Sequence, residues 1–327
     1  MKICIFGGNG FVGATVARKA VARGWKVVSV SRSGTPFATA AGHTPAWVNE
    51  VEWRKGSAFD AATYESILPS CDGLVTTLGA LFESEYKREG LARPLSILKA
   101  IVENATGSRG NPLAVSKEKS YERLNRDSAI QLFEAFRTSR SAPGDSAPSP
   151  FVFISAEDIF RPFVPERYIR TKREAEHAIW SRTSEDAERP RVRPVFVRPS
   201  KYPSPASLTF SLTSVNAGLM YHPHLNPPST LPATLLEASA KVHALIPPTL
   251  RLAPSPSPSP IPTTDIPPAY VSLASLTSIP PIHVDAVGEA VCQSMASPDI
   301  EGVVDVQRMR EMLGFDPLGW TAQQTTV

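Results

Sequence analysis

A glycine-rich turn between a short β-rich run and a helical run constrains this chain more than any other feature. Residues 2–6 (KICIF) favour a buried strand, and the turn that follows has glycine at positions 7, 10 and 13. Apolar and basic side chains then recur at helical spacing, and a second β-rich run follows at residues 26–30. This succession of strand, turn, helix and strand predicts a βαβ unit with parallel strands.

Each glycine of the turn meets a steric need of a dinucleotide site. Gly7 permits the tight turn out of the strand, Gly10 lets the backbone approach a pyrophosphate, and Gly13 lets the helix pack closely on the strand. The helix that starts at Phe11 and Val12 offers free N–H groups and a partial positive charge to the phosphates. We therefore predict that these five residues bind a dinucleotide.

The same alternation of strands and helices continues to about residue 200. Further candidate strands lie at residues 51–54, 73–78, 151–155 and 192–198, and candidate helices at 121–138 and 168–182. This order predicts an α/β fold with a doubly wound parallel sheet, the Rossmann type, as a dinucleotide-binding domain over residues 1–200.

Proline changes the character of the chain after Pro199. More than half of the 32 prolines lie between residues 199 and 281, and such a run is incompatible with central sheet or regular helix. We interpret residues 201–281 as a proline-rich, partly disordered insertion with one helix, at residues 231–246. Residues 282–313 then return to a small, degenerate C-terminal lobe, and residues 314–327 form a tail.

The end of the second strand bears on the choice of cofactor. An NAD site usually has an acidic residue there, whereas this strand ends Val-Ser-Arg-Ser, and Arg32 can grip a 2′-phosphate. We favour NADP(H) over NAD(H), although a solvated loop cation is the other interpretation of Arg32. Asp60 could flank the adenine or serve only as a turn residue. Leu78 and Gly79, where the fourth strand ends, would let the backbone pass beside the cofactor.

A second pattern has the residue types of acid–base catalysis. Tyr168 and Lys172 are four residues apart in a helical run, so they share one face. A nearby ammonium favours the ionised phenol and makes tyrosine a better proton donor and acceptor. Ser155 closes the fifth strand, at the sheet edge where ligands bind, and could hydrogen-bond a substrate oxygen. The alternative is a packed tyrosine beside a solvated lysine.

Composition excludes several classes of protein. The 34 basic residues barely exceed the 31 acidic ones, which argues against a nucleic-acid-binding protein. The three cysteines are widely spaced, so we expect neither a disulfide framework nor a zinc site, and metal ligand spacing is absent among the histidines. No stretch is long and apolar enough to predict a transmembrane helix.

With these motifs, the chain resembles the short-chain dehydrogenase/reductase superfamily in its extended and atypical branches. The resemblance is carried by residues 7–13 (GGNGFVG), Ser155, residues 168–172 (YIRTK), the Arg-Pro pair at 198–199 and residues 282–287 (IHVDAV). It implies a catalytic triad of Ser155, Tyr168 and Lys172, with Lys172 also holding the nicotinamide ribose. Ala286 departs from the family, which has a second acid there, and the proline-rich insertion replaces much of the usual substrate lobe.

Within the superfamily, the chain is most similar to the group of the fungal mitochondrial NAD(P)-binding protein of coenzyme Q biosynthesis, which is related to an accessory subunit of complex I. This resemblance implies a mitochondrial oxidoreductase, on the matrix side of the inner membrane, that works on a hydrophobic substrate within a quinone-synthesising complex. The alternatives are a cytoplasmic location, a nucleotide-binding subunit without turnover, and an epimerase or dehydratase of nucleotide sugars.

Overall fold

The computed structural model describes a set of ranges that together carry every predicted site residue. These ranges are 1–39, 42–79, 121–140, 147–159, 161, 164–185, 190–199, 220–221, 230–245, 259–275 and 278–315. Much of the predicted insertion and most of the predicted tail lie outside the described residues, and so does the disorder predicted there. The division of the chain into domains therefore stays a prediction.

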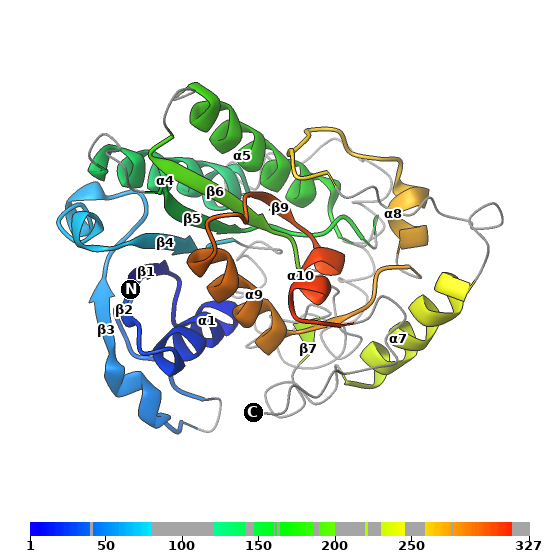
Figure 1. Cartoon of the computed structure of the whole chain (residues 1–327), viewed down its shortest axis with the longest axis horizontal. Coiled ribbons are helices and arrows are strands. Elements are labelled where there is room, and N and C mark those ends of the chain that lie inside the picture. Colours follow the sequence, from blue (N-terminus) through cyan, green and yellow to red (C-terminus); the bar gives the residue numbers. More distant parts are fainter. Residues whose placement is uncertain are drawn as a thin grey trace, which may run out of the picture.

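Seven strands form one sheet in which every neighbouring pair is parallel (Figure 1). They are β1 (Lys2–Phe6), β2 (Lys26–Ser31), β3 (Val51–Lys55), β4 (Gly73–Thr76), β5 (Ser149–Ile154), β6 (Val192–Val197) and β9 (Gly302–Val304). Their order is β3-β2-β1-β4-β5-β6-β9, so the winding reverses between β1 and β4. The predicted doubly wound sheet is confirmed, and ligands of such sheets bind beyond the carboxyl ends of the strands at this reversal.

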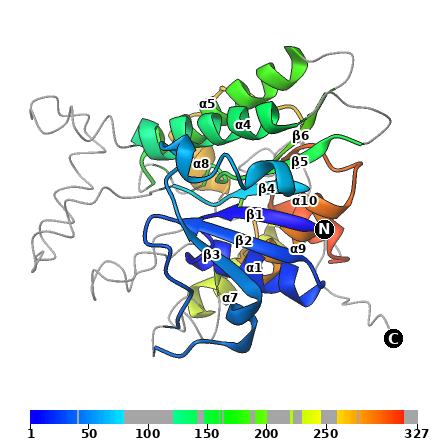
Figure 2. The ribbon, with the colours of Figure 1, turned by 90° about the vertical axis from the view of Figure 1, so that its left-hand side faces the viewer.

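Helices cover both faces of the sheet. Figure 2 shows α1 (Phe11–Ala22) and α9 (Val284–Ala296) on one face, with α4 (Ser128–Ser139) and α5 (Glu166–Glu185) on the other. Arg18 of α1 and Arg23, the residue after α1, form ion pairs with Asp285 and Glu289 of α9, so these basic side chains hold the two helices together.

The side chains of each strand point alternately to the two faces of the sheet, and they contribute to two apolar layers. On β1, Ile3 and Ile5 pack in the layer beneath α1 and α9, whereas Cys4 and Phe6 pack in the layer beneath α4. Successive side chains of a strand point to opposite faces, so a strand that is apolar at every position must be covered on both sides. Burial on both faces explains why the runs that the sequence predicts as strands are apolar.

Several elements of the structure were not expected from the sequence, and two of them bear on the predictions above. The first is β9, whose three residues are too few to show a strand pattern. The second is α8 (Ala269–Ser275), so the prediction of one helix within residues 201–281 is wrong, because α7 (Thr230–Leu245) is also present. α8 begins directly after two prolines, which are tolerated there because first-turn N–H groups have no partner within a helix.

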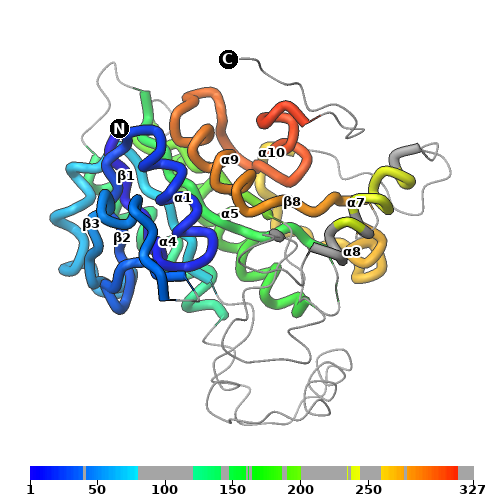
Figure 3. Tube along the Cα trace, turned by 90° about the horizontal axis from the view of Figure 1, so that it is seen from below, coloured from blue at the N-terminus to red at the C-terminus, as the bar shows by residue number. Residues whose placement is uncertain are grey.

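Further helices and a small second sheet accompany the seven-stranded sheet. Figure 3 shows α7, α8 and α10 (Val306–Met312) gathered at one end of the molecule. β7 (Met220–Tyr221) and β8 (Ile282–His283) form a separate two-stranded sheet. The remaining short elements are η1 (Ala46–Glu50), η2 (Ala61–Thr63), η3 (Leu68–Ser70) and a π-helical segment, η5 (Glu122–Asp127). Within the described ranges, no helix combines the length and the apolarity needed to cross a bilayer.

Candidate functional site

The glycine turn sits at the reversal of the sheet, between β1 and α1. Gly7 has φ of +86°, and a Cβ there would lie 2.6 Å from Oγ1 of Thr77, the residue that follows β4. The Thr77 hydroxyl itself donates to the Phe6 carbonyl at 2.9 Å. A Cβ on Gly13 would overlap the Gly7 carbonyl. The turn is therefore closed against β4 on one side and against α1 on the other, and only glycine fits these two positions.

The N-terminus of α1 is free to receive an anion. Its N-cap is Gly10, which has no side chain to satisfy the first N–H groups, and the first turn contains no acidic residue. A Cβ on Gly10 would already lie 3.2 Å from the Gly7 carbonyl, so a side chain would occupy the space beside the turn. Uncapped N–H groups and the helix dipole favour a phosphate here, and the residues present fit a dinucleotide.

The loop after β2 carries polar groups beside this turn. Nδ2 of Asn9 lies 3.3 Å from the Ser33 hydroxyl, which in turn lies 2.7 Å from the Thr35 hydroxyl. Arg32 is exposed within the same loop. Lys55, at the carboxyl end of β3, is paired in register with Ser31, so a second cation stands at this edge. The loop therefore combines hydroxyl groups with positive charge.

Asp60 also lies at this edge of the sheet, in the turn after β3. It is exposed, and its backbone N–H donates to the Ser57 carbonyl at 2.9 Å. Asp60 precedes η2 as its N-cap without a side-chain cap bond. Its contact with an adenine stays a prediction.

Lys172 joins the ends of two strands. Its side chain is 1% exposed, and its Nζ donates to the carbonyl of Leu78 at 3.1 Å and to that of Ile154 at 2.9 Å. The same ammonium lies 4.4 Å from the ring centroid of Phe153. A buried cation requires such partners, because desolvation without them is costly. Lys172 is consequently held at the carboxyl ends of β4 and β5, next to Gly79.

Tyr168 lies one turn before Lys172 on α5, and its side chain is fully buried. It packs with Ala156, Val164 and Ile169 in a small cluster between α5 and the segment that follows β5. Ser155 directly follows β5, and its N–H donates to the Val197 carbonyl at 2.7 Å. The fold thus brings the three predicted catalytic residues to one region of the carboxyl edge.

Asn125 belongs to the same region, and the sequence interpretation did not select it. It is fully buried on the π-helical segment before α4. A Cβ on Gly79 would lie 2.9 Å from Nζ of Lys172 and 3.0 Å from Oδ1 of Asn125. Gly79 therefore lets both polar side chains approach the backbone after β4. A lone asparagine in a helical run gives no sequence signal of this kind.

A buried ionic cluster lies beneath the site. Glu176, one turn after Lys172, is fully buried, with Arg173 at 3.0 Å and Arg198 donating to both of its carboxylate oxygens. Burial opposes the charge of Glu176, but the two arginines outweigh it and hold its pKa below the ordinary value. For Glu157 burial prevails instead, because the same arginines only partly offset it, and its pKa is raised.

The opposite pKa shifts of Glu176 and Glu157 predict opposite effects of their substitutions on stability. Glu176→Gln should destabilise the protein by about 3–5 kcal/mol, because it leaves buried arginines uncompensated. A carboxyl with a lowered pKa stabilises the fold above its unfolded pKa, and that stability is lost as the pH falls through its folded pKa. Glu157→Gln should instead raise the midpoint of thermal unfolding at neutral pH, because the fold already favours the uncharged group.

Thermal unfolding between pH 4 and pH 8 measures both effects. Glu174→Gln is the control, since its pair with Arg126 is part-exposed and such pairs contribute only about 0–1 kcal/mol. Equal midpoints for the Glu176 and Glu174 variants at pH 7 would contradict the assignment.

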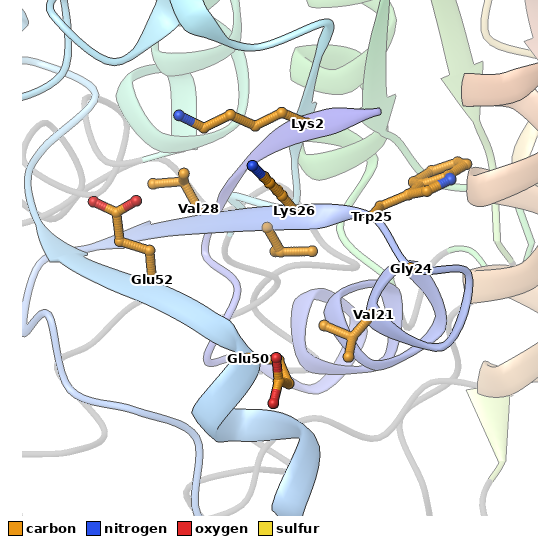
Figure 4. A pocket seen from close by; sticks show the side chains of 9 residues that line it. Lys2, Val21, Gly24, Trp25, Lys26, Val28, Glu50 and Glu52 are labelled. Atoms are coloured by element: carbon orange, nitrogen blue, oxygen red, sulfur yellow. The ribbon is translucent and has the colours of Figure 1, made fainter.

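A separate groove lies at the amino ends of β1 and β2 (Figure 4). Lys2, Lys26, Glu50 and Glu52 line it, with Trp25 at one end. Its charges balance, and it lies at the edge of the sheet opposite the glycine turn. It is therefore not part of the nucleotide site.

Comparison with known proteins agrees with this geometry. Residues 3–79 match the model of the NAD dependent epimerase/dehydratase family. MIOREX complex component 2 of Saccharomyces cerevisiae is 33% identical over 204 residues, which cover 61% of this chain and 71% of the yeast protein. The chain belongs to the epimerase/dehydratase family of short-chain dehydrogenase/reductases. The match of the family model spans β1 through Gly79, which is the half of the site that would hold the nucleotide.

Two further comparisons gave weaker similarities. An uncharacterized chloroplastic protein of Arabidopsis thaliana is 32% identical over 87 residues, 27% of each chain. Among solved structures, a short-chain dehydrogenase/reductase of Burkholderia thailandensis has 14% identity and a TM-score of 0.49, covering 94% of this chain and 92% of its own.

Proposed function

We propose that this chain is an NADP(H)-dependent oxidoreductase that interconverts a carbonyl and a hydroxyl group of a hydrophobic substrate. The observation that carries the proposal is the position of Lys172 and Tyr168. The ammonium of Lys172 is fixed to the ends of β4 and β5, and Tyr168 lies one turn away, at the edge of the sheet that carries the uncapped glycine turn. Cation, phenol and phosphate site are the parts that a pyridine-nucleotide reductase needs.

Each side chain has a defined part in the proposed reaction. NADPH, when bound, supplies the hydride that reaches the carbonyl carbon. The Tyr168 phenol gives its proton to the carbonyl oxygen, and the positive charge of Lys172 stabilises the phenolate that remains. Ser155 orients the substrate oxygen at the end of β5. Lys172 would also hold the nicotinamide ribose when the cofactor is bound.

We infer NADP(H) rather than NAD(H) from the loop after β2. Its Arg32 is exposed, the hydroxyl groups of Ser33 and Thr35 lie beside it, and Lys55 stands at the next strand end. A 2′-phosphate accepts charge-assisted hydrogen bonds from such groups, and no acidic side chain in residues 31–35 offers the ribose an alternative.

Arg32→Asp should therefore invert the cofactor preference. We expect the Kd for NADPH to rise about 10- to 100-fold, the loss of one charge-assisted hydrogen-bonded pair, while the Kd for NADH stays equal or falls. Fluorescence titration of the two reduced cofactors measures both constants. Lys26→Asp, at the amino end of the same strand, is the control. An unchanged NADPH constant in Arg32→Asp would contradict the inference.

We further propose a mitochondrial site of action, in a quinone-synthesising complex at the matrix side of the inner membrane. Support comes from the resemblance to the coenzyme Q group and from the yeast relative, which is named as a component of a complex. The test is NADPH oxidation at 340 nm by the purified protein with hydrophobic quinones and ring precursors. Oxidation with such compounds is expected, and none with any of them would contradict the proposed substrate class.

A nucleotide-binding subunit without turnover is the second candidate, and the name of the yeast relative as a complex component favours it. In that case bound NADPH should raise the midpoint of thermal unfolding by mass action without being consumed. Consumption that Lys172→Ala abolishes would exclude this candidate. The third candidate is an epimerase or dehydratase of nucleotide sugars. Sugar nucleotides should then raise the midpoint of thermal unfolding in the same measurement.

A further inference from the structure

Arg161 is the most deeply buried charged side chain of the segment between Ser155 and Tyr168. It is 2% exposed, and its guanidinium binds Asp158 with two hydrogen bonds, of 2.7 and 2.8 Å. Glu166, at the start of α5, lies 3.4 Å away. An arginine is seldom buried so completely unless its donors are paired, and here they are paired mainly with this short segment and the helix that follows.

The same cluster reaches the end of the proline-rich region. The Arg161 guanidinium also donates to the Pro267 carbonyl. The backbone N–H of Arg161 donates to the Ser272 hydroxyl at 3.1 Å. That hydroxyl donates to Asp158 at 2.9 Å. Ser272 is fully buried on α8. Two segments more than a hundred residues apart are therefore joined by one set of hydrogen bonds, which we call the Arg161 cluster.

A second attachment fixes the same region to the sheet. The N–H of Val303, on the edge strand β9, donates to the Pro260 carbonyl at 2.9 Å. The chain from Pro260 to Ser272 is thus held at both ends, by the sheet edge and by the segment after β5. The C-terminal end of the proline-rich region consequently belongs to the structure at the carboxyl edge of the sheet.

We propose that Arg161 is a positioning residue for the catalytic pair, and that it acts by fastening the segment after β5 to α8 and the end of the proline-rich region. The segment that Arg161 anchors supplies Ala156 and Val164, two of the side chains that pack on Tyr168. Fastening it to α8 fixes where the phenol of Tyr168 lies relative to Ser155. This inference rests on the proposed function for the meaning of the site, but its test requires no turnover.

The test compares Arg161→Met with Arg193→Met by hydrogen–deuterium exchange. Arg193 is a matched control, since it is also buried and donates to two backbone carbonyls, of Ile300 and Ser294, near the amino end of β6. In Arg161→Met, amide exchange should rise at least about tenfold in residues 156–161 and in residues 269–275 together. In Arg193→Met neither segment should change.

Nitration by tetranitromethane, mapped by mass spectrometry, reports directly on Tyr168. The buried phenol should resist nitration in the parent protein and in Arg193→Met, and react in Arg161→Met. Arg161→Lys, which keeps the charge without the forked pair, should give intermediate nitration. Ser272→Ala is a milder second variant, should Arg161→Met fail to fold, and should loosen the same two segments.

Exchange that rises in only one of the two segments would overturn the inference, and so would nitration of Tyr168 no higher than in Arg193→Met. These outcomes are distinguishable from failure of the proposed function. A parent protein that consumes no NADPH counts against the oxidoreductase and leaves the exchange result intact.

Discussion

Tyr168→Phe is expected to lower the rate of NADPH oxidation by about 10²- to 10⁴-fold, the range that a positioned general acid supplies. Phenylalanine preserves the packing against Ala156, Val164 and Ile169 and removes only the proton-bearing oxygen. The affinity for NADPH should stay within about twofold, because the glycine turn and α1, which would hold the phosphates, are untouched. The measurement is the 340 nm assay together with fluorescence titration of the cofactor.

Tyr270→Phe provides the matched control for this experiment. Tyr270 is 72% exposed on α8, so its hydroxyl group is not part of the site. The control variant should oxidise NADPH at the parental rate. Full activity in Tyr168→Phe would exclude Tyr168 as the proton donor and leave the buried phenol with a packing role alone.

The sequence predicts those elements whose side chains follow the regular period of a strand or a helix. β1 and β2 were each placed within one residue, with α1 between them, because strand alternation, helix spacing and the glycine turn all indicate the same βαβ unit. The doubly wound order followed from the alternation of elements. The edge strand β9 could not be found, because a strand of three residues is too short to show an alternating pattern.

The chemistry of the site was predictable only in part. Tyr168 and Lys172 stand four residues apart, and a helix places such a pair on one face whatever the rest of the fold does. The buried partners were not predictable, since charged residues such as Arg161 and Glu176 are expected at the surface. Only the tertiary fold brings Ser272 to Arg161 and Arg198 to Glu176. Asn125 was missed for the same reason.

Gly10→Ala should weaken dinucleotide binding strongly while leaving the fold in place. Its Cβ would lie 3.2 Å from the Gly7 carbonyl, beside the uncapped N–H groups of α1. A pyrophosphate held off these groups loses charge-assisted hydrogen bonds of about 1.5–3 kcal/mol each, so two of them amount to a roughly 100-fold or greater loss of affinity. Gly10 has φ of −81°, so alanine fits its backbone conformation and the fold should persist.

Gly24→Ala is the control for stability. Gly24 has φ of +71° after α1, with nothing within 4 Å of an added Cβ, so alanine there strains the backbone without touching the site. This control should unfold at a lower temperature than the parent protein and still bind the dinucleotide. A loss of binding that merely followed a loss of stability would appear in both variants.

Isothermal titration calorimetry of the parent protein, Gly10→Ala and Gly24→Ala with NADPH and NADH tests the dinucleotide site most directly. We predict heat of binding for the parent and for Gly24→Ala, with the tighter constant for NADPH, and none for Gly10→Ala at the same concentrations. Absence of heat from the parent protein with either cofactor, or equal binding by Gly10→Ala, would contradict the account.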